Sequence, residues 1–168
     1  MHDISLYGDM PLTAVVAQFL NNEEWEDEIS VSEDRLRATV STTIGIQSQP
    51  YRLFFEIYED DQRVSVFLYS PFTVPPERAA AMARILNRIN FQLTFGRLAF
   101  QDEGEAEPIQ FLAVIDADSS SLSVQQVSIL LSFCFSMDRF HELLSAVAMT
   151  KIPEDQLWKE HLDREQVE

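Results

Sequence analysis

Apolar and polar residues alternate along two neighbouring stretches of the chain, residues 51–58 and 64–68, with the polar run EDDQ between them at 59–62. A period of two is typical of strands with one buried face, and the short polar connection predicts a β-hairpin. The apolar positions of that face are Leu53, Phe55, Ile57, Val64, Val66 and Leu68. The opposite face carries Phe54, Tyr58, Phe67 and Tyr69. We therefore expect either a second layer or a contact surface on that side.

Three further stretches have strand patterns, namely residues 35–42, 93–100 and 109–115. In the second of them the alternation changes parity at Gly96. Glycine at such a position predicts a bulge or a sharp bend, because it tolerates backbone conformations that other residues avoid.

Three other stretches space their apolar residues as a helix does. They are residues 11–20, residues 75–90, which begin with a pair of prolines, and residues 124–149, which are apolar on more than one face. Asn90 ends the second pattern, and we expect it to cap that helix in the left-handed conformation. The third pattern predicts one long helix that is buried on several sides.

The predicted elements follow one another in the order α-β-β-β-α-β-β-α. This order indicates an α+β fold, with an antiparallel sheet of about five strands packed with helices. A length of 168 residues is typical of one domain, which we expect to span residues 1–150. Residues 151–168 are charged, and we expect a tail or a short helix there.

Acidic residues outnumber basic residues by 28 to 12, which gives a formal net charge of −16. Nucleic acids and anionic membranes attract cationic proteins, so we expect neither as a partner. The charge is compatible with two interpretations, a basic partner or a solvated acidic surface that serves only solubility.

Cys134 is the only cysteine, so no disulfide forms within the chain, and its apolar neighbours predict a buried, unreactive thiol. The first ten residues lack the basic and apolar regions of a signal peptide. The longest strongly apolar stretch, residues 129–135, is too short to span a bilayer. We therefore expect a cytoplasmic protein.

Familiar catalytic and metal-binding motifs are missing from the sequence. Its four glycines are too scattered for a dinucleotide-binding loop, and neither lysine follows a glycine as in a P-loop. Cys134 and His141 are seven residues apart on the predicted helix, ~10 Å, which is too far for a nucleophile–base pair. Residues 116–127 begin like a calcium loop but have Ser121 and Val127 where glycine and glutamate are required. We expect no catalytic residue, no metal and no cofactor.

The aromatic and apolar residues exceed what one sheet face and its covering helices need. We expect the surplus to form protein interfaces, at Phe54, Tyr58, Phe67, Tyr69, Phe133, Phe135 and Met137. Monomers rarely expose large apolar patches, and a twofold-related copy is the commonest way to cover one. A homodimer is therefore expected.

A set of local features in residues 70–147 resembles the bacterial YbjN family. The matching features are Ser70-Pro71, Val74-Pro75-Pro76-Glu77-Arg78, Arg88-Ile89-Asn90, Leu93, Gly96, Leu98, Gly104-Glu105 and Asp138-Arg139-Phe140. The chain departs from the family pattern at residues 97–99, where members often have Asn-Phe-Glu. It also departs at residues 108–114, which are nearly neutral where members often have basic and aromatic residues.

The resemblance implies a type III secretion chaperone-like fold, in a family described as sensory transduction regulators with no established enzyme activity. Chaperones of this fold commonly form homodimers and hold extended segments of their clients. The leading hypothesis is a non-enzymatic adaptor that recognises a protein segment, from a client or a regulator, through apolar sheet and helix surfaces. The alternative is a ligand-responsive regulator with a small-molecule pocket between the sheet and the last helix. A hydrolase without a visible motif ranks third.

Overall fold

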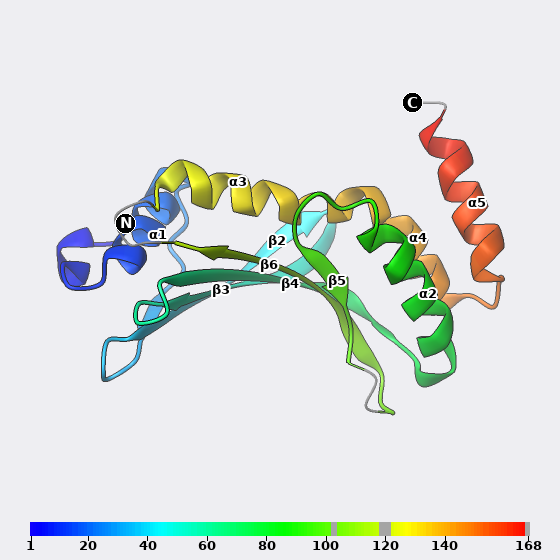
Figure 1. The fold of residues 1–168 in the computed structure, drawn as a ribbon, viewed down its shortest axis with the longest axis horizontal. Helices are drawn as coiled ribbons and strands as arrows, with labels where there is room; N and C mark the ends of the chain where they lie inside the picture. The colour runs from blue at the N-terminus through cyan, green and yellow to red at the C-terminus, as the bar shows by residue number, and fades with distance from the viewer. Residues whose placement is uncertain (102–103, 118–121, 167–168) are drawn as a thin grey trace.

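A single antiparallel sheet with the strand order β1-β2-β3-β4-β6-β5 organises the computed structural model, which describes residues 1–101, 104–117 and 122–166. The strands are β1 (Ile29–Val31), β2 (Arg37–Ile46), β3 (Gln49–Tyr58), β4 (Arg63–Val74), β5 (Arg97–Ala99) and β6 (Glu107–Asp116). Consecutive hairpins join β2, β3 and β4, whereas β6 inserts between β4 and β5. Figure 1 shows the resulting long, twisted layer.

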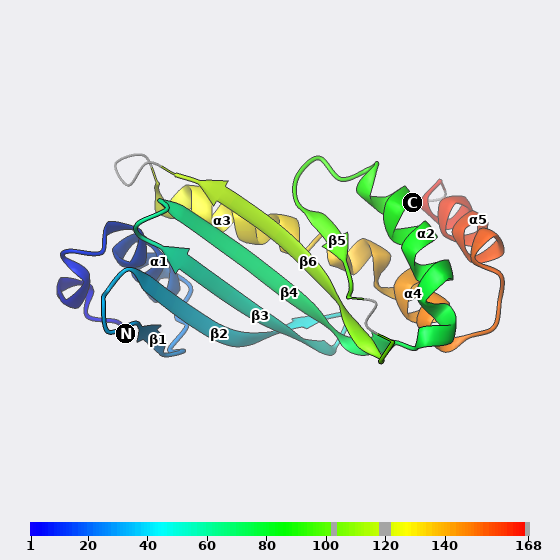
Figure 2. The same cartoon turned by 60° about the horizontal axis from the view of Figure 1, so that its bottom comes forward.

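Helices cover one face and one end of this sheet. They are α1 (Pro11–Asn22), α2 (Ala79–Asn90), α3 (Val124–Cys134), α4 (Met137–Met149) and α5 (Glu154–Glu165), with short 3-10 turns η1 (Ile4–Tyr7) and η2 (Pro76–Arg78). Helices α1, α3 and α4 lie along one face, and α2 and α5 stand at one end (Figure 1). No helix of the described residues covers the other face, which comes forward in Figure 2. None of the described helices combines the length and apolarity that a bilayer crossing requires.

The core lies between the sheet and the helices that cover it. Completely buried cross-strand pairs of β3 and β4 are Leu53 with Leu68, Phe55 with Val66 and Ile57 with Val64. These are the apolar positions of the hairpin predicted from the alternating pattern, so the prediction is confirmed. Removing such side chains from water is the main favourable contribution to folding.

The sheet contains one strand more than the sequence indicated. β1 was missed because three residues are too few to reveal a period of two, and it pairs at the sheet edge with β2. Conversely, the strand expected over residues 93–100 is reduced to β5. Gly96 lies just before β5 with φ +75°, so the expected bend is confirmed, and it ends the extended run that the sequence suggested.

The single helix expected over residues 124–149 is wrong, because Phe135 and Ser136 separate α3 from α4. Ser136 donates both its backbone N–H (3.1 Å) and its hydroxyl (2.6 Å) to the carbonyl of Phe133, which produces a tight turn. Such local hydrogen bonds compete with the regular helical pattern and bend helices. The charged C-terminal residues form α5 rather than an extended tail, and Leu157 of α5 joins the core.

Candidate functional site

The uncovered side of the sheet, termed the open face below, presents a stripe of large side chains across the strands. Phe54 on β3 pairs with Phe67 on β4, which pairs with Leu112 on β6, which pairs with Arg97 on β5. Paired residues in an antiparallel sheet project to the same side, so these four side chains form one continuous row. The three apolar members are half-buried among their neighbours.

Arginine side chains lie over the aromatic rings of the open face. The Arg52 guanidinium is 6.0 Å from the Phe54 ring centre and 5.9 Å from that of Tyr69, and the two rings pack edge to face at 5.5 Å. Cation–π contacts of this kind orient a guanidinium without neutralising its charge. The open face is therefore aromatic and positively charged at once.

Tyr58 occupies a second position of this kind nearer one end of the sheet. The guanidinium carbons of Arg37 and Arg63 lie 5.1 Å and 4.4 Å from its ring centre. Its hydroxyl donates to Glu56 at 2.7 Å, and this hydrogen bond raises the pKa of Tyr58. All four aromatic residues predicted on this side of the hairpin thus share one uncovered face.

The other predicted interface residues lie elsewhere. Met137 is only 1% exposed and belongs to the core, so its side chain is not on the surface. Phe133 is half-buried on the helix-covered side and packs against Phe95 with ring centres 5.0 Å apart. Phe135 is 43% exposed. The structure therefore does not bring the helix residues and the open-face residues together into one surface.

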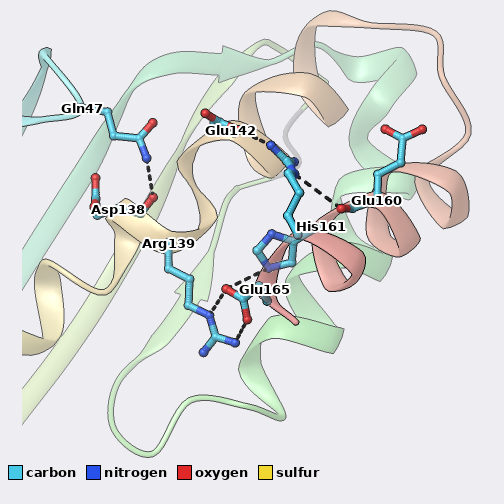
Figure 3. A network of polar contacts seen from close by, with 8 residues as sticks. Gln47, Asp138, Arg139, Glu142, Glu160, His161 and Glu165 are labelled. Carbon is cyan, nitrogen blue, oxygen red and sulfur yellow. Dashed lines mark hydrogen bonds and ion pairs between the residues drawn. The ribbon is translucent and has the colours of Figure 1, made fainter. Parts of the chain in front are cut away.

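A hollow of about 520 Å³ lies between α4 and α5, and Figure 3 shows its polar contacts. Arg139 of α4 bonds Glu165 of α5, and Arg164 of α5 bonds Glu142 of α4. Each helix thus supplies one arginine and one glutamate, and the two ion pairs hold α5 against α4. The lining is polar and largely paired with itself, which indicates a clamp rather than a ligand site.

His161 of α5 is 5% exposed and packs between the rings of Phe140 and Trp158. Burial lowers its pKa, and the Arg139 and Arg164 charges act in the same direction, whereas Glu165 and Glu142 oppose them. Sequence reasoning missed this residue, because it falls in the charged segment that was expected to be a tail or a short helix.

The two residues that the sequence analysis tested and rejected as a nucleophile–base pair lie in structural contacts. Cys134 is buried, and desolvation raises its pKa to about 12, so the thiol stays protonated. His141 shares a hydrogen bond of 2.6 Å with the Tyr51 hydroxyl, and burial lowers its pKa. Within residues 1–101, 104–117 and 122–166, no three metal-ligating side chains gather. Residues 118–121 of the calcium-loop test lie outside the described residues.

Two hollows lie between the sheet and the last helical segment: one of about 610 Å³ where Phe72 and Thr73 of β4 meet Met149 at the end of α4, and a smaller one under α3. The hollow between β6 and α3 is lined mainly by Phe95, Ile115, Ile129 and Phe133 and has a volume of about 200 Å³. Pockets for small molecules usually enclose roughly 300–1,000 Å³. The hollow between β6 and α3 is thus smaller than most small-molecule pockets, whereas the hollow between β4 and α4 falls within their range.

Comparisons with known proteins agree with this architecture. Residues 13–137 match the model of the YbjN family, described as "Putative bacterial sensory transduction regulator". Among solved structures, a chain of the ExsC–ExsE complex superimposes with a TM-score of 0.54 at 12% identity, covering 83% of this chain and 96% of that one. A chain of the HopA1–SchA chaperone–effector complex gives 0.50 at 13% identity, with coverage of 83% and 96%. The fold is thus type III secretion chaperone-like.

The structure of YbjN from E. coli is also similar, with a TM-score of 0.48 at 10% identity, covering 78% of this chain and 87% of that one. A search of curated protein sequences found no match.

Proposed function

The chain belongs to the YbjN family, described as a bacterial sensory transduction regulator, and we propose that it is a non-enzymatic binding module. In this proposal it holds an extended segment of a partner protein on the open face. The observation that carries the proposal is the stripe of Phe54, Phe67 and Leu112 on a sheet face that no described helix covers. Two similar structures are those of a protein complex, ExsC–ExsE, and of a chaperone–effector complex, HopA1–SchA, which supports a protein partner.

The open face suits a protein segment because its apolar area is long and shallow. An extended chain laid on such a face buries alternate side chains while the others stay in water. Phe54 and Phe67 supply large apolar contact area at low cost in side-chain entropy, which is why aromatic residues are enriched in interfaces. A small molecule would leave most of this stripe in solvent.

We further propose that the protein works as a cytoplasmic homodimer that uses the helix-covered side for self-association. Ile129 on α3 is 48% exposed and Phe135 in the turn after α3 is 43% exposed, and the open face stays free for the partner.

Light scattering tests this arrangement, because the dimer should have a mass of twice 19.3 kDa. The dimer fraction should increase at moderate salt, because salt screens the repulsion between two chains of charge −16. Phe135→Glu should give the monomer, and a wild-type mass of 19.3 kDa would contradict the dimer.

Selection from a library of random peptides tests the binding function directly. The full-length chain is immobilised, enriched peptides are synthesised, and their affinities are measured by calorimetry. Phe67→Ser should weaken binding at least tenfold, whereas Phe91→Ser, which changes a phenylalanine that is 89% exposed beyond α2, should leave it unchanged. Failure to enrich any peptide, or equal affinity for the wild type and Phe67→Ser, would disprove the proposal.

A further inference from the structure

The arginines of this acidic chain are distributed unevenly. Four of the ten, Arg37, Arg52, Arg63 and Arg97, project from β2, β3, β4 and β5 on the open face. Only two carboxylates, Glu56 and Asp116, occupy strand positions of the same face. The open face is thus locally positive in a molecule whose net charge is −16.

Most arginines outside the open face are already paired. Five of them form ion pairs, namely Arg35, Arg84, Arg88, Arg139 and Arg164. Arg78 donates to the backbone carbonyls of Val147 and Ile152. With carboxylates in more than twofold excess, a guanidinium on this protein readily finds a partner.

The open-face arginines behave differently. Arg63 has a carboxylate partner, Asp61 at 3.5 Å. The side chains of Arg37, Arg52 and Arg97, by contrast, form no ion pair or hydrogen bond with the residues that the structure describes. Three unpaired guanidinium groups on one aromatic face indicate a surface that takes its carboxylates from another molecule.

The positions of Arg52 and Arg97 fix a spacing for those carboxylates. They stand near the two ends of the apolar stripe, on β3 and β5, ~14 Å apart across the sheet and, because Arg52 aligns with Ala99 rather than Arg97, also two residues or ~7 Å apart along the strands. The backbone separation is therefore ~16 Å, and an extended chain that advances by ~3.3 Å per residue spans ~13 Å in four residues, so the long arginine side chains cover the remaining ~3 Å. In an extended segment, residues i, i+2 and i+4 face the same side. Carboxylates at i and i+4 would then flank one large apolar side chain at i+2.

A hollow for that central side chain is present beside the stripe. It is lined by Phe95, Gly96, Arg97, Leu112 and Val114 and has a volume of about 250 Å³. Its walls are mainly apolar, and Arg97 is the one charged residue among them. An aromatic or aliphatic side chain in this hollow would exclude water from the neighbouring ion pair, which strengthens it.

We propose that the open face binds an extended acidic protein segment in which two carboxylates four residues apart flank a large apolar residue. Arg52 and Arg97 each bind one carboxylate, and the apolar residue packs on Phe67 and Leu112. This inference rests on the proposed function and adds the chemistry of the partner to it.

Two other occupants are less compatible with the open face. Single-stranded nucleic acid also uses arginines and aromatic rings, but the rings here are half-buried, and the net charge of −16 repels phosphates. A second copy could offer its own acidic stretch at Glu23–Glu28. Its Trp25, however, packs edge to face on Phe19 at 6.0 Å and is not free to leave.

Peptides of defined charge test the proposal. The peptide GSDSFSDSG carries the predicted spacing, and GSNSFSNSG replaces its carboxylates with neutral amides. Binding is followed by NMR shifts of the Phe67 and Leu112 amides in the full-length chain. We expect GSDSFSDSG to bind at least tenfold more tightly than GSNSFSNSG. We also expect Arg52→Gln with Arg97→Gln to abolish the difference, whereas Lys151→Gln, which removes one charge elsewhere, should leave it unchanged.

Charge reversal gives a positive readout that does not depend on loss of folding. The double variant Arg52→Glu, Arg97→Glu should bind GSKSFSKSG and reject GSDSFSDSG. Library peptides that need Phe67 but carry no excess of acidic residues would overturn this inference and leave the proposed function intact. Arginine-dependent binding of oligo(dT), or conversion of a dimer to a monomer by Arg52→Gln, would overturn it in favour of nucleic acid or of a second copy.

Discussion

The side chain of Asn90 forms two hydrogen bonds with the backbone of Leu98. Its amide nitrogen donates to the Leu98 carbonyl at 2.9 Å, and its amide oxygen accepts from the Leu98 N–H at 2.8 Å. Asn90 is the last residue of α2 and Leu98 the middle of β5, so the pair closes the loop between these elements. The expected left-handed cap is wrong, because Asn90 is the last helical residue of α2 and does not have a positive φ.

Replacing Asn90 with alanine should destabilise the protein by ~1–3 kcal/mol. The change leaves a backbone donor and acceptor of buried Leu98 without partners, and such groups carry their full desolvation cost. Asn87→Ala is the matched control, because Asn87 is exposed on the same helix and alanine is the better helix former. Urea unfolding of both variants checks the prediction, and equal stability of the two would contradict it.

Gly96 and Gly104 allow a second comparison, because both have positive φ, +75° and +85°. A Cβ at Gly96 would lie 2.4 Å from the ring of Phe111, whereas one at Gly104 would meet nothing within 4 Å. Gly104→Ala should therefore lower the free energy of unfolding only by the ~1 kcal/mol that the left-handed conformation costs a residue with a Cβ. Gly96→Ala adds a steric clash with a core ring and should lower the melting temperature by several degrees more. Similar melting temperatures would show that Phe111 moves aside freely.

The periodic parts of the fold were predictable because burial imposes them on the sequence. The hairpin of β3 and β4 shows its buried face at every second residue, and α2 shows its face at helical spacing. The edge strand β1 has too few residues to show a period. The break between α3 and α4 depends on hydrogen bonds of Ser136, and serine also occurs within continuous helices. Local pattern alone did not reveal these features.

Part of the candidate site was predictable because the period of two in β3 and β4 shows which side chains share a face. Alternation placed Phe54 and Phe67 on one side of the hairpin, and the same parity places Arg52 beside Phe54. That signal was present in the sequence and could have found the arginine. That Arg52 and Arg97 form no ion pair with residues 1–101, 104–117 and 122–166 is a property of the assembled surface, which no local pattern contains. Met137 was assigned to an interface because its neighbours are apolar, but its side of α4 faces the core.

Helix α5 should depend on its apolar contacts more than on its ion pairs. Leu157→Ala creates a cavity at a residue that is 6% exposed and should weaken the docking of α5 by ~2 kcal/mol or more. Glu154→Gln breaks the ion pair with Arg84, whose side chain is 57% exposed, and should cost less than ~1 kcal/mol. Limited proteolysis after Lys159 measures the opening of α5 in each variant. Faster cleavage of Glu154→Gln than of Leu157→Ala would show that charge holds the helix.

The docking of α5 should weaken as the pH falls from 7 to 5. Burial lowers the pKa of His161 below its ordinary value of 6.5, so the undocked helix binds a proton before the docked helix does. The neutral His161 ring therefore contributes fully to the stability of the docked helix above pH 6.5, and this contribution is lost as the pH falls toward the lowered pKa. Hydrogen exchange of the α5 amides, corrected for the intrinsic exchange rate, reports this local opening.

His161→Phe supplies the control for that titration, because it keeps a ring between Phe140 and Trp158 and removes the proton-binding site. The pH dependence of α5 exchange should disappear in this variant. His141 has a lowered pKa as well, but it lies on α4, so its titration affects unfolding of the core rather than opening of α5 alone. Glu165 lies 3.8 Å from the His161 Nε2 and favours the protonated ring. Stronger protection of α5 at pH 5 would mean that this carboxylate outweighs burial.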